Sequence, residues 1–248
     1  CAYCDFYSLA GQEERMDDYQ RALTAHLAEA APQAASWTVD TIYFGGGTPS
    51  FYGAKRLTGL LKWIKKHYRV DKQAEITLEA NPDSVDLKML ARLRKAGFNR
   101  ISLGVQSADD GQLASLGRPH TFGQARQAVE WARRAEFQNL SLDLIYGLPD
   151  QTMEDWQRTL ADAVALGPEH LSCYGLKVEE GTPLWQQRQQ LTLPDDDAQA
   201  DMYLYTVAAL EEAGVRDLQL RKARAGVPPQ PEILEHGGVR RFRPRGTL

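Results

Sequence analysis

The chain has 248 residues, enough for one large domain or two small ones with a buried core. Hydrophobic residues make up 43% and charged residues 25%, as in an ordinary globular protein, and the formal net charge of -4 excludes a general nucleic-acid binder, which would be basic. Three cysteines are too few for a disulfide framework and no apolar run approaches the length of a membrane span, so we expect a cytoplasmic protein.

The chain opens with two cysteines three positions apart, in Cys1-Ala2-Tyr3-Cys4-Asp5-Phe6. Two thiols at this spacing can reach one metal centre. Taken alone, the pair is compatible with half of a zinc site, a redox dithiol or part of an iron–sulfur cluster. No strand precedes the pair, and we expect the sequence to be cut off at its start.

Helix and strand patterns alternate along the rest of the chain. Apolar residues at helical spacing, with breakers after them, predict helices over 13–31, 54–68, 86–96, 109–116, 122–136, 152–166 and 195–213. Short apolar runs between them predict strands over 39–44, 75–80, 100–105, 140–145 and 170–176. Such alternation is typical of parallel β/α units, which build either a doubly wound sheet or a barrel.

Polar residues stand at the ends of several predicted strands. The loop Gly45-Gly46-Gly47-Thr48-Pro49-Ser50 can expose backbone N–H groups to a ligand, although it has neither a Walker A pattern nor the spaced dinucleotide fingerprint, and a tight turn is the alternative. Glu79 and Gln106 also stand at strand ends, where a carboxylate or amide can contact a ligand; for each taken alone, a solvated strand end is the better interpretation. Asp143 lies inside an apolar strand and favours a functional role, because a buried Asp is uncommon without a partner. The ligand sites of parallel β/α folds lie at this edge of the sheet.

Four further side chains have simpler interpretations. Arg118 stands in a loop, where a lone arginine is usually solvated, and only the wider pattern brings it into a site. Cys173 lies within a strand and is expected to be a buried, inert thiol. His120 and His170 have no partner at ligand spacing, and we interpret both as structural.

Together these motifs resemble the radical SAM superfamily, in the branch that contains oxygen-independent coproporphyrinogen III oxidase and the HemW-type heme chaperones. The resemblance runs from Cys1 to about Leu210. Its branch-specific elements are Leu78-Glu79-Ala80-Asn81-Pro82, Gly104-Val105-Gln106-Ser107 and Asp143-Leu144-Ile145-Tyr146-Gly147-Leu148-Pro149. It implies a (β/α)6-type barrel over residues 1–213, here missing its first strand.

The resemblance also implies cofactors and the residues that hold them. The family motif C-x-x-x-C-x-x-C binds a four-iron, four-sulfur (4Fe–4S) cluster, and Cys1 and Cys4 match its second and third cysteines. S-adenosylmethionine then binds the open iron. By position, Tyr3 would pack beside the cluster and the cofactor. The residues that would contact S-adenosylmethionine are Tyr3, Gly46, Gly47, Thr48, Glu79, Gln106, Arg118 and Asp143.

One position distinguishes the two roles within this branch. The oxidases carry another cysteine two positions after the third ligand, where this chain has Phe6. We therefore favour a heme chaperone, with heme as cargo, heme-accepting proteins as partners, a homodimer as one expected arrangement, no nucleic acid, and membrane association only through a recipient. The alternatives are the oxidase, which decarboxylates porphyrinogen propionates to vinyl groups, and a structural β/α protein that binds zinc.

The last 35 residues, 214–248, do not fit the family. They hold many arginines and prolines without periodicity. Reading the codons of 217–247 one base later can spell, by choice among synonymous codons, a family-like peptide with a His-Asn-Leu-Lys-Tyr element that resembles the heme-binding element of the chaperones. We interpret 214–248 as an aberrant, frameshifted and disordered tail, a hypothesis that the underlying DNA would test.

Overall fold

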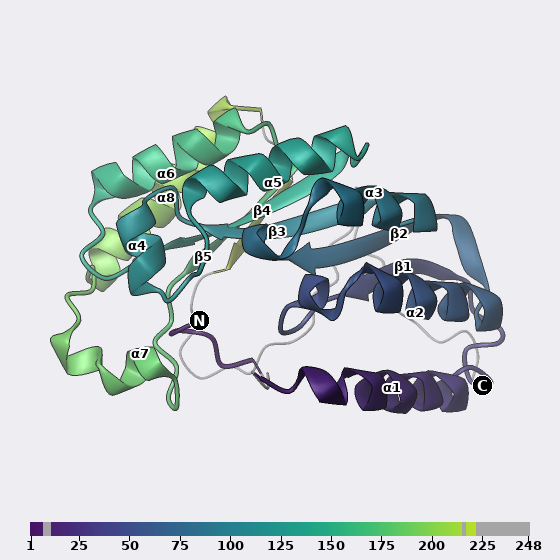
Figure 1. Ribbon diagram of the computed structural model, residues 1–248. Helices are drawn as coiled ribbons and strands as arrows, with labels where there is room; N and C mark the ends of the chain where they lie inside the picture. Colours follow the sequence, from purple (N-terminus) through teal and green to yellow (C-terminus); the bar gives the residue numbers. More distant parts are fainter. Residues whose placement is uncertain (7–10, 215–216, 222–248) are drawn as a thin grey trace, which may run out of the picture.

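The computed structural model describes residues 1–6, 11–214 and 217–221, with backbone alone for the last segment. Figure 1 shows a curled sheet flanked by helices. The strands are β1 (Val39–Phe44), β2 (Val70–Ala80), β3 (Arg100–Gln106), β4 (Asn139–Tyr146), β5 (His170–Gly175) and β6 (Asp217–Arg221). The helices are α1 (Met16–Ala30), α2 (Ala54–His67), α3 (Leu87–Ala96), α4 (Asp110–Ser115), α5 (Phe122–Arg134), α6 (Met153–Ala165), α7 (Pro183–Gln186) and α8 (Asp196–Glu212). Short 3-10 helices add η1 (Glu13–Arg15), η2 (Pro49–Tyr52), η3 (Pro82–Ser84) and η4 (Arg188–Gln190).

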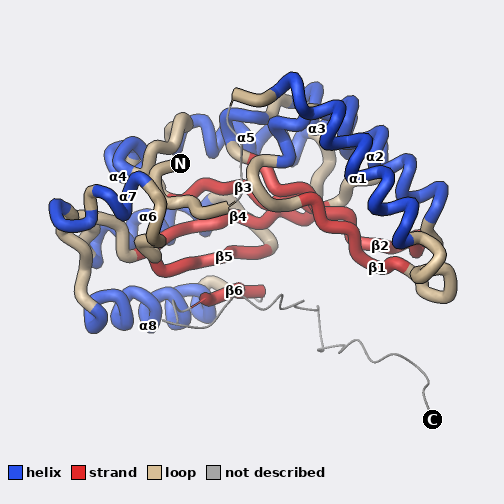
Figure 2. The backbone as a smooth tube through the Cα atoms, turned by 90° about the horizontal axis from the view of Figure 1, so that it is seen from below, coloured by secondary structure: helices blue, strands red, loops and turns tan. Residues whose placement is uncertain are grey.

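The order of the strands decides between the two predicted architectures. All neighbours in the sheet are parallel, and the order β1-β2-β3-β4-β5-β6 follows the chain without reversal. A doubly wound sheet reverses its order at a switch point, whereas a barrel adds each strand beside the previous one. Figure 2 shows the sheet curling in this way. The structure therefore confirms the prediction of a partial barrel.

The two faces of the sheet have different chemistry. In β2, Ile76, Leu78 and Ala80 are buried in the main core, while Glu79 points to the opposite face. The register carries this alternation across the sheet, because Leu78 pairs with Ile101, and Glu79 with Ser102. The apolar face packs against α2, α3, α5, α6 and α8. The concave face is left lined by polar side chains.

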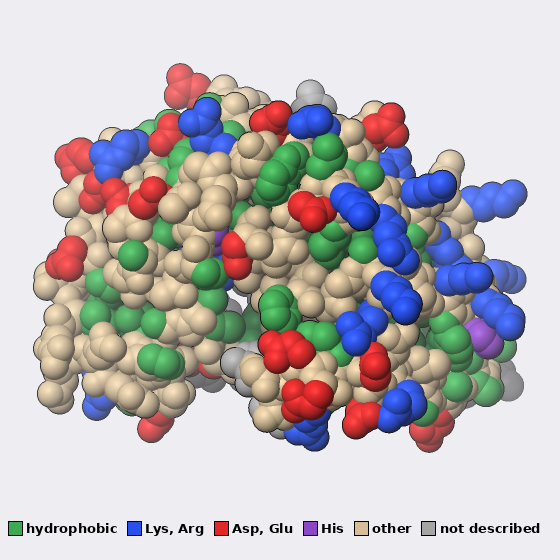
Figure 3. Space-filling model, viewed as in Figure 1, with side chains coloured by type: hydrophobic (Ala, Val, Ile, Leu, Met, Phe, Trp, Pro, Cys, Tyr) green, Lys and Arg blue, Asp and Glu red, His purple; other side chains and the backbone are tan. Residues whose placement is uncertain are grey.

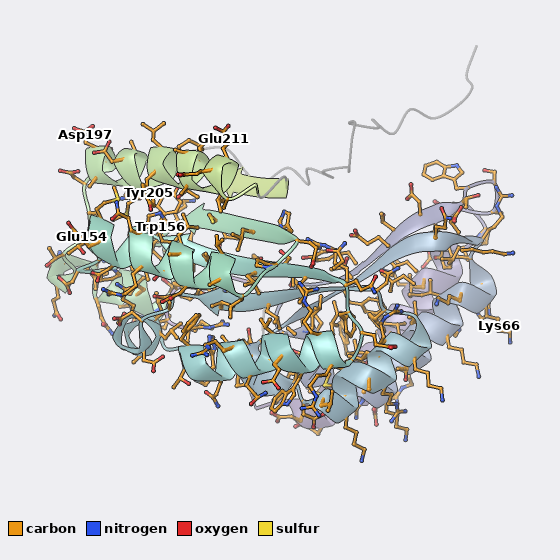
Figure 4. All side chains as sticks on the ribbon, turned by 90° about the horizontal axis from the view of Figure 1, so that it is seen from above. Lys66, Glu154, Trp156, Asp197, Tyr205 and Glu211 are labelled. Atoms are coloured by element: carbon orange, nitrogen blue, oxygen red, sulfur yellow. The ribbon has the colours of Figure 1, made fainter. Side chains whose placement is uncertain are left out.

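Helix α8 packs against α6 and covers part of the main core. Trp156 of α6 is fully buried, and its indole N–H donates to Met202 O at 3.2 Å and to Thr206 Oγ1 at 2.9 Å. Figure 4 shows Trp156 between the two helices. This packing extends the core to the end of the segment predicted as the barrel.

The sheet continues beyond that predicted segment. The backbone of β6 pairs in parallel with β5, Asp217 opposite His170 and Arg221 opposite Tyr174. The prediction of a disordered tail over 214–248 did not include this strand. Leu218 and Leu220 alternate with polar residues as in a strand, but the pattern covers only five residues beside a stretch rich in arginine and proline. The remaining part of the predicted tail, 222–248, lies outside the described residues.

No helix within the described segments is long and apolar enough to cross a membrane.

The start of α6 carries a reciprocal cap. Asp155 N donates to Thr152 Oγ1 at 3.2 Å, and Thr152 N donates to Asp155 Oδ2 at 3.1 Å. Substitution of Thr152 by Ala leaves one of these N–H groups without its acceptor, so we expect the free energy of unfolding to fall by about 1 kcal/mol. Urea denaturation of the Thr152→Ala chain measures this loss, and Thr152→Ser is the control that should retain most of the stability.

Candidate functional site

The N-terminal residues are fixed at the carboxyl edge of the sheet. Ala2 N donates to Leu116 O at 2.9 Å, and Leu184 N donates to Ala2 O at 2.8 Å. Ala2 and Tyr3 also pack against a second apolar cluster made of Leu116, Ile145, Leu148, Leu176 and Leu184. Backbone hydrogen bonds on both sides of Ala2 therefore hold Cys1 close to the ends of β3 and β4.

Arg118 connects the cysteine segment to the sheet. Its Nη1 donates to Cys1 Sγ at 3.1 Å, and its Nη2 donates to both Asn81 Oδ1 and Gly104 O at 2.8 Å. The side chain is almost completely buried, and its Nε has no acceptor among the described residues. A positive charge beside sulfur favours the thiolate, which is the form that binds metal. An unpaired buried donor points to an acceptor that a bound molecule would supply.

Glu79 organises the glycine loop. Its carboxylate accepts from Tyr43 Oη at 2.6 Å and from Gly46 N at 3.0 Å. Gly46 has φ +116°, in the region that favours glycine, and an added Cβ would meet nothing within 4 Å. Thr48 Oγ1 accepts from Asn81 Nδ2 at 3.3 Å, so the loop is fixed at both ends. The backbone between them faces open space.

Gly104 is the point where three polar side chains converge. A Cβ there would lie 2.7 Å from Gln106 Nε2, 3.0 Å from Arg118 Nη2 and 3.4 Å from Asn81 Oδ1. Gln106 has φ +69°, an unusual conformation for a residue other than glycine. The turn brings its side chain back over Gly104. Strained backbone of this kind occurs most often where a site needs a side chain in a fixed direction.

Asp143 of β4 lies beside Gly104 of the neighbouring strand β3. Ser102 Oγ donates to its two carboxylate oxygens at 3.1 and 3.2 Å. The pKa of Asp143 is raised to about 6, mainly because the carboxyl group is buried and also because the Glu79 carboxylate is near, while hydrogen bonds from Ser102 and Ser172 lower the pKa in part. A carboxyl group with this pKa can exchange a proton near neutral pH.

The raised pKa of Asp143 makes stability depend on pH. The folded chain holds this proton more tightly than the unfolded chain, so its contribution is present at low pH and is lost as pH rises from about 4 to about 6. We expect a loss on the order of 2 kcal/mol, absent from the Asp143→Asn chain. Urea denaturation of both chains across this range measures the difference. Parallel pH profiles would contradict the assignment.

The structure brings most of the predicted site residues to one edge of the barrel. Tyr3 is half-buried there, and its removal from solvent raises its pKa, while the Arg118 guanidinium nearby lowers it. For two predicted residues the structure shows only their exposure: Gly47 is exposed in the loop, and Cys4, next to Tyr3, is half-buried. The predicted residues gathered here are Cys1, Tyr3, Gly46, Thr48, Glu79, Gln106, Arg118 and Asp143.

Three contributors were not among the predicted site residues. Asn81 bridges Arg118 and Thr48, Tyr43 holds Glu79, and Ser102 holds Asp143. Alternation along the strands could have found Tyr43 and Ser102, because both share the concave face with Glu79 and Asp143. Position could have found Asn81, the first residue after β2.

The other predicted roles concern single side chains. Cys173 is fully buried on the apolar face, and burial raises its pKa to about 12, as expected for an inert thiol. His120 is buried with its Nε2 3.1 Å from Val105 O, and His170 Nδ1 lies 2.7 Å from Ser141 Oγ. Within residues 1–6, 11–214 and 217–221, no group of three or more His, Cys, Asp and Glu side chains could hold a metal ion. Among these residues, no third side chain of these types joins Cys1 and Cys4.

Comparison with known proteins connects this geometry to a family. The model of the radical SAM superfamily matches residues 1–163. The heme chaperone HemW of Mycobacterium tuberculosis is 40% identical over 219 residues, covering 86% of this chain and 56% of the relative. HemW of Escherichia coli is 38% identical over 220 residues, covering 88% and 58%. The chain thus spans less than two thirds of the length of these relatives.

The fold has a matching solved structure. Coproporphyrinogen III oxidase (HemN) from Escherichia coli, a radical SAM enzyme, superimposes with a TM-score of 0.78 at 28% identity, over 86% of this chain and 50% of that one. The family match, the HemW relatives and this structural match all agree with the motifs on β2, β3 and β4. The chain belongs to the radical SAM superfamily, in the branch of the HemW-type heme chaperones and coproporphyrinogen III oxidase.

Proposed function

We propose that this chain forms the part of a heme chaperone that binds a 4Fe–4S cluster and S-adenosylmethionine. The observation that carries the proposal is the convergence of Arg118, Gln106 and Asn81 on Gly104, beside the thiol of Cys1. A buried guanidinium with a free donor, a strained turn and an open glycine loop all face the same edge of the sheet. This arrangement suits a small polar molecule bound beside a metal centre.

The residues present fit S-adenosylmethionine. Its methionine end carries an ammonium and a carboxylate, and its sugar carries hydroxyl groups. The loop of Gly46, Gly47 and Thr48 would meet the methionine end, while Glu79 and Asp143 are carboxylates that can accept from an ammonium or a hydroxyl. The unpaired Nε of Arg118 can donate to a carboxylate or a hydroxyl.

The cluster fits the chain in part. Cys1 and Cys4 would supply two thiolates, one fewer than the family motif, and Tyr3 would pack beside them. When bound, the cluster and S-adenosylmethionine together supply radical chemistry or, in a chaperone, a structural metal centre. The work of this chain is to bind and orient: Arg118 donates to Cys1 Sγ, and Glu79 fixes the loop by accepting from Gly46 N.

Iron reconstitution on two matched extended chains tests cluster binding. Adding Cys-Ala-Ala-Ala before Cys1 completes the C-x-x-x-C-x-x-C motif, and adding Ser-Ala-Ala-Ala gives the control. After anaerobic incubation with iron and sulfide, we expect the cysteine-extended chain to retain about four irons, with the brown absorption of a 4Fe–4S cluster, and the serine control to retain fewer. Stable zinc binding by both chains, without iron retention, would favour the structural zinc alternative.

Heme delivery is the role we propose for the whole protein. The support is the similarity to HemW, at 33–40% identity in three bacterial relatives, together with Phe6 in the place of an additional cysteine. Heme, proteins that accept it and a second copy of the chain are the partners that this role implies. Transfer of heme from the loaded protein to an apo-hemoprotein is the corresponding assay.

The second candidate is the oxidase activity, favoured by the structural match to coproporphyrinogen III oxidase. A turnover assay with coproporphyrinogen separates the two roles. Vinyl product from the whole, cluster-loaded protein would support the oxidase and overturn the chaperone assignment. Heme binding without any turnover would support the chaperone.

A further inference from the structure

Helices α2 and α3 carry a concentrated positive charge on a chain that is acidic overall. The sequence of α2 is AKRLTGLLKWIKKH and that of α3 is LKMLARLRKA, and neither contains an acidic residue. The whole chain has 33 acidic and 29 basic residues, so acidic residues predominate in the remainder. Figure 3 shows the Lys and Arg side chains gathered on the side of the molecule that these two helices occupy.

The cations form two rows that point away from the sheet. On α2 they recur at i, i+7 and i+11, opposite Leu57 and Leu61, and on α3 at i, i+4 and i+7, opposite Leu90 and Leu93. The four leucines enter the same core, so both rows face solvent on one side of the barrel. Figure 4 shows Lys66 pointing outward at the end of α2. We call this surface the basic face: Lys55, Lys62, Lys66, Lys88, Arg92 and Lys95.

The charges of the basic face are not neutralised by ion pairs within the part of the chain that the structure describes. All six side chains are exposed, and none is in an ion pair with another described residue. The nearest acid along α3, Asp86, is already used as its N-cap and accepts from Met89 N at 2.6 Å. Lys65 Nζ donates to Ala96 O at 3.3 Å and ties the two helices together. The two rows are thus held side by side on a rigid support.

The chemistry of this surface distinguishes between possible partners. Protein–protein interfaces are depleted of Lys and rely on central aromatic or other apolar anchors. None of the large exposed hydrophobic side chains among the described residues lies on α2 or α3. Duplex nucleic acid is bound mostly through arginines and elements that enter a groove, whereas the basic face is mostly lysine on two helices flanking a sheet. Rows of lysine without an apolar anchor suit a planar layer of anionic headgroups.

We propose that the basic face docks this protein directly on a membrane surface rich in anionic phospholipid. Outside α2 and α3, residues 1–214 carry an excess of acidic residues, which such a surface repels. The face lies on the convex side of the barrel, so the cofactor edge stays accessible when the protein is attached. Docking is electrostatic and reversible, and salt weakens it. The proposal is independent of the function of the cofactor edge.

Vesicle sedimentation with the full chain tests the proposal. The probes are vesicles of phosphatidylcholine with about one third phosphatidylglycerol, and vesicles of phosphatidylcholine alone. The test variant is Lys62→Gln with Lys66→Gln and Arg92→Gln, and the control is Arg126→Gln with Arg158→Gln and Arg188→Gln, which removes the same charge from α5, α6 and η4. Circular dichroism verifies that each chain is folded.

We expect the original chain and the control to sediment with the anionic vesicles and to stay in the supernatant with the neutral ones. The partition coefficient of the test variant should fall about fivefold per cation, or roughly a hundredfold for three. Equal binding to both vesicle types, or an equal loss in the control, would overturn the proposal. Tighter binding to a random DNA duplex than to anionic vesicles at the same salt, lost in the test variant, would overturn it in favour of nucleic acid.

Discussion

Substitution of Arg118 by Met is expected to weaken the binding of S-adenosylmethionine about a hundredfold. The methionine side chain fills similar space but cannot donate to Cys1 Sγ, Asn81 Oδ1 or Gly104 O, all of which Arg118 now satisfies. Asn81 also loses the partner that keeps its amide directed toward Thr48. Isothermal titration calorimetry of the ligand on the original and substituted chains measures the change in affinity.

A second arginine serves as the matched control for this prediction. Arg133 also donates to a backbone carbonyl, Gly167 O at 2.6 Å, and it pairs with Glu169, but it lies at the C-terminal end of α5. We expect Arg133→Met to leave the affinity unchanged. Equal affinities of the Arg118→Met chain and the original chain would show that the ligand does not contact this edge of the sheet.

Substitution of Gly104 by Ala should have a comparable effect for a steric reason. The new methyl group would lie 2.7 Å from Gln106 Nε2 and 3.0 Å from Arg118 Nη2, closer than carbon and nitrogen normally approach. Both atoms are the ends of flexible side chains, so the free energy of unfolding should change little, but both side chains must move and we expect the affinity for S-adenosylmethionine to fall roughly a hundredfold.

Gly59 provides the control for a glycine-to-alanine change. It lies in α2, and an added Cβ would meet only Gln20 Nε2, at 3.9 Å. Gly59→Ala should stabilise the chain by about 1 kcal/mol through helix propensity and leave the affinity unchanged. Calorimetric titration and urea denaturation of both variants separate the local clash from a general effect of the substitution.

The candidate residues that lie on or beside strands could be predicted from the sequence. Glu79, Gln106 and Asp143 stand at or near the carboxyl ends of short apolar runs, and parallel β/α packing brings such ends together whatever the loops do. The alternation of the elements predicted parallel β/α units. The choice between a barrel and a doubly wound sheet needed the strand order, which local patterns do not determine.

The contacts made by loop residues could not be predicted from the sequence. Arg118 lies in a loop after α4, and its path toward Cys1 depends on the contacts of Ala2 with Leu116 and Leu184, which are distant in sequence. The role of Asn81 depends on the same path, because its amide is placed by Arg118 and Thr48. Strand β6 was not predicted because its alternation of Leu218 and Leu220 with polar residues is short, and its pairing with the edge of β5 is visible only in the structure.

Amide hydrogen exchange with and without S-adenosylmethionine is the most direct test of the central claim, that the carboxyl edge of the barrel is the cofactor site. A ligand bound at this edge should slow exchange at the glycine loop, at Asn81, and at the turns after β3 and β4, while α1 and α8 stay unchanged. Saturating ligand that slows exchange elsewhere and leaves the Gly46 loop and Gln106 unchanged would contradict it.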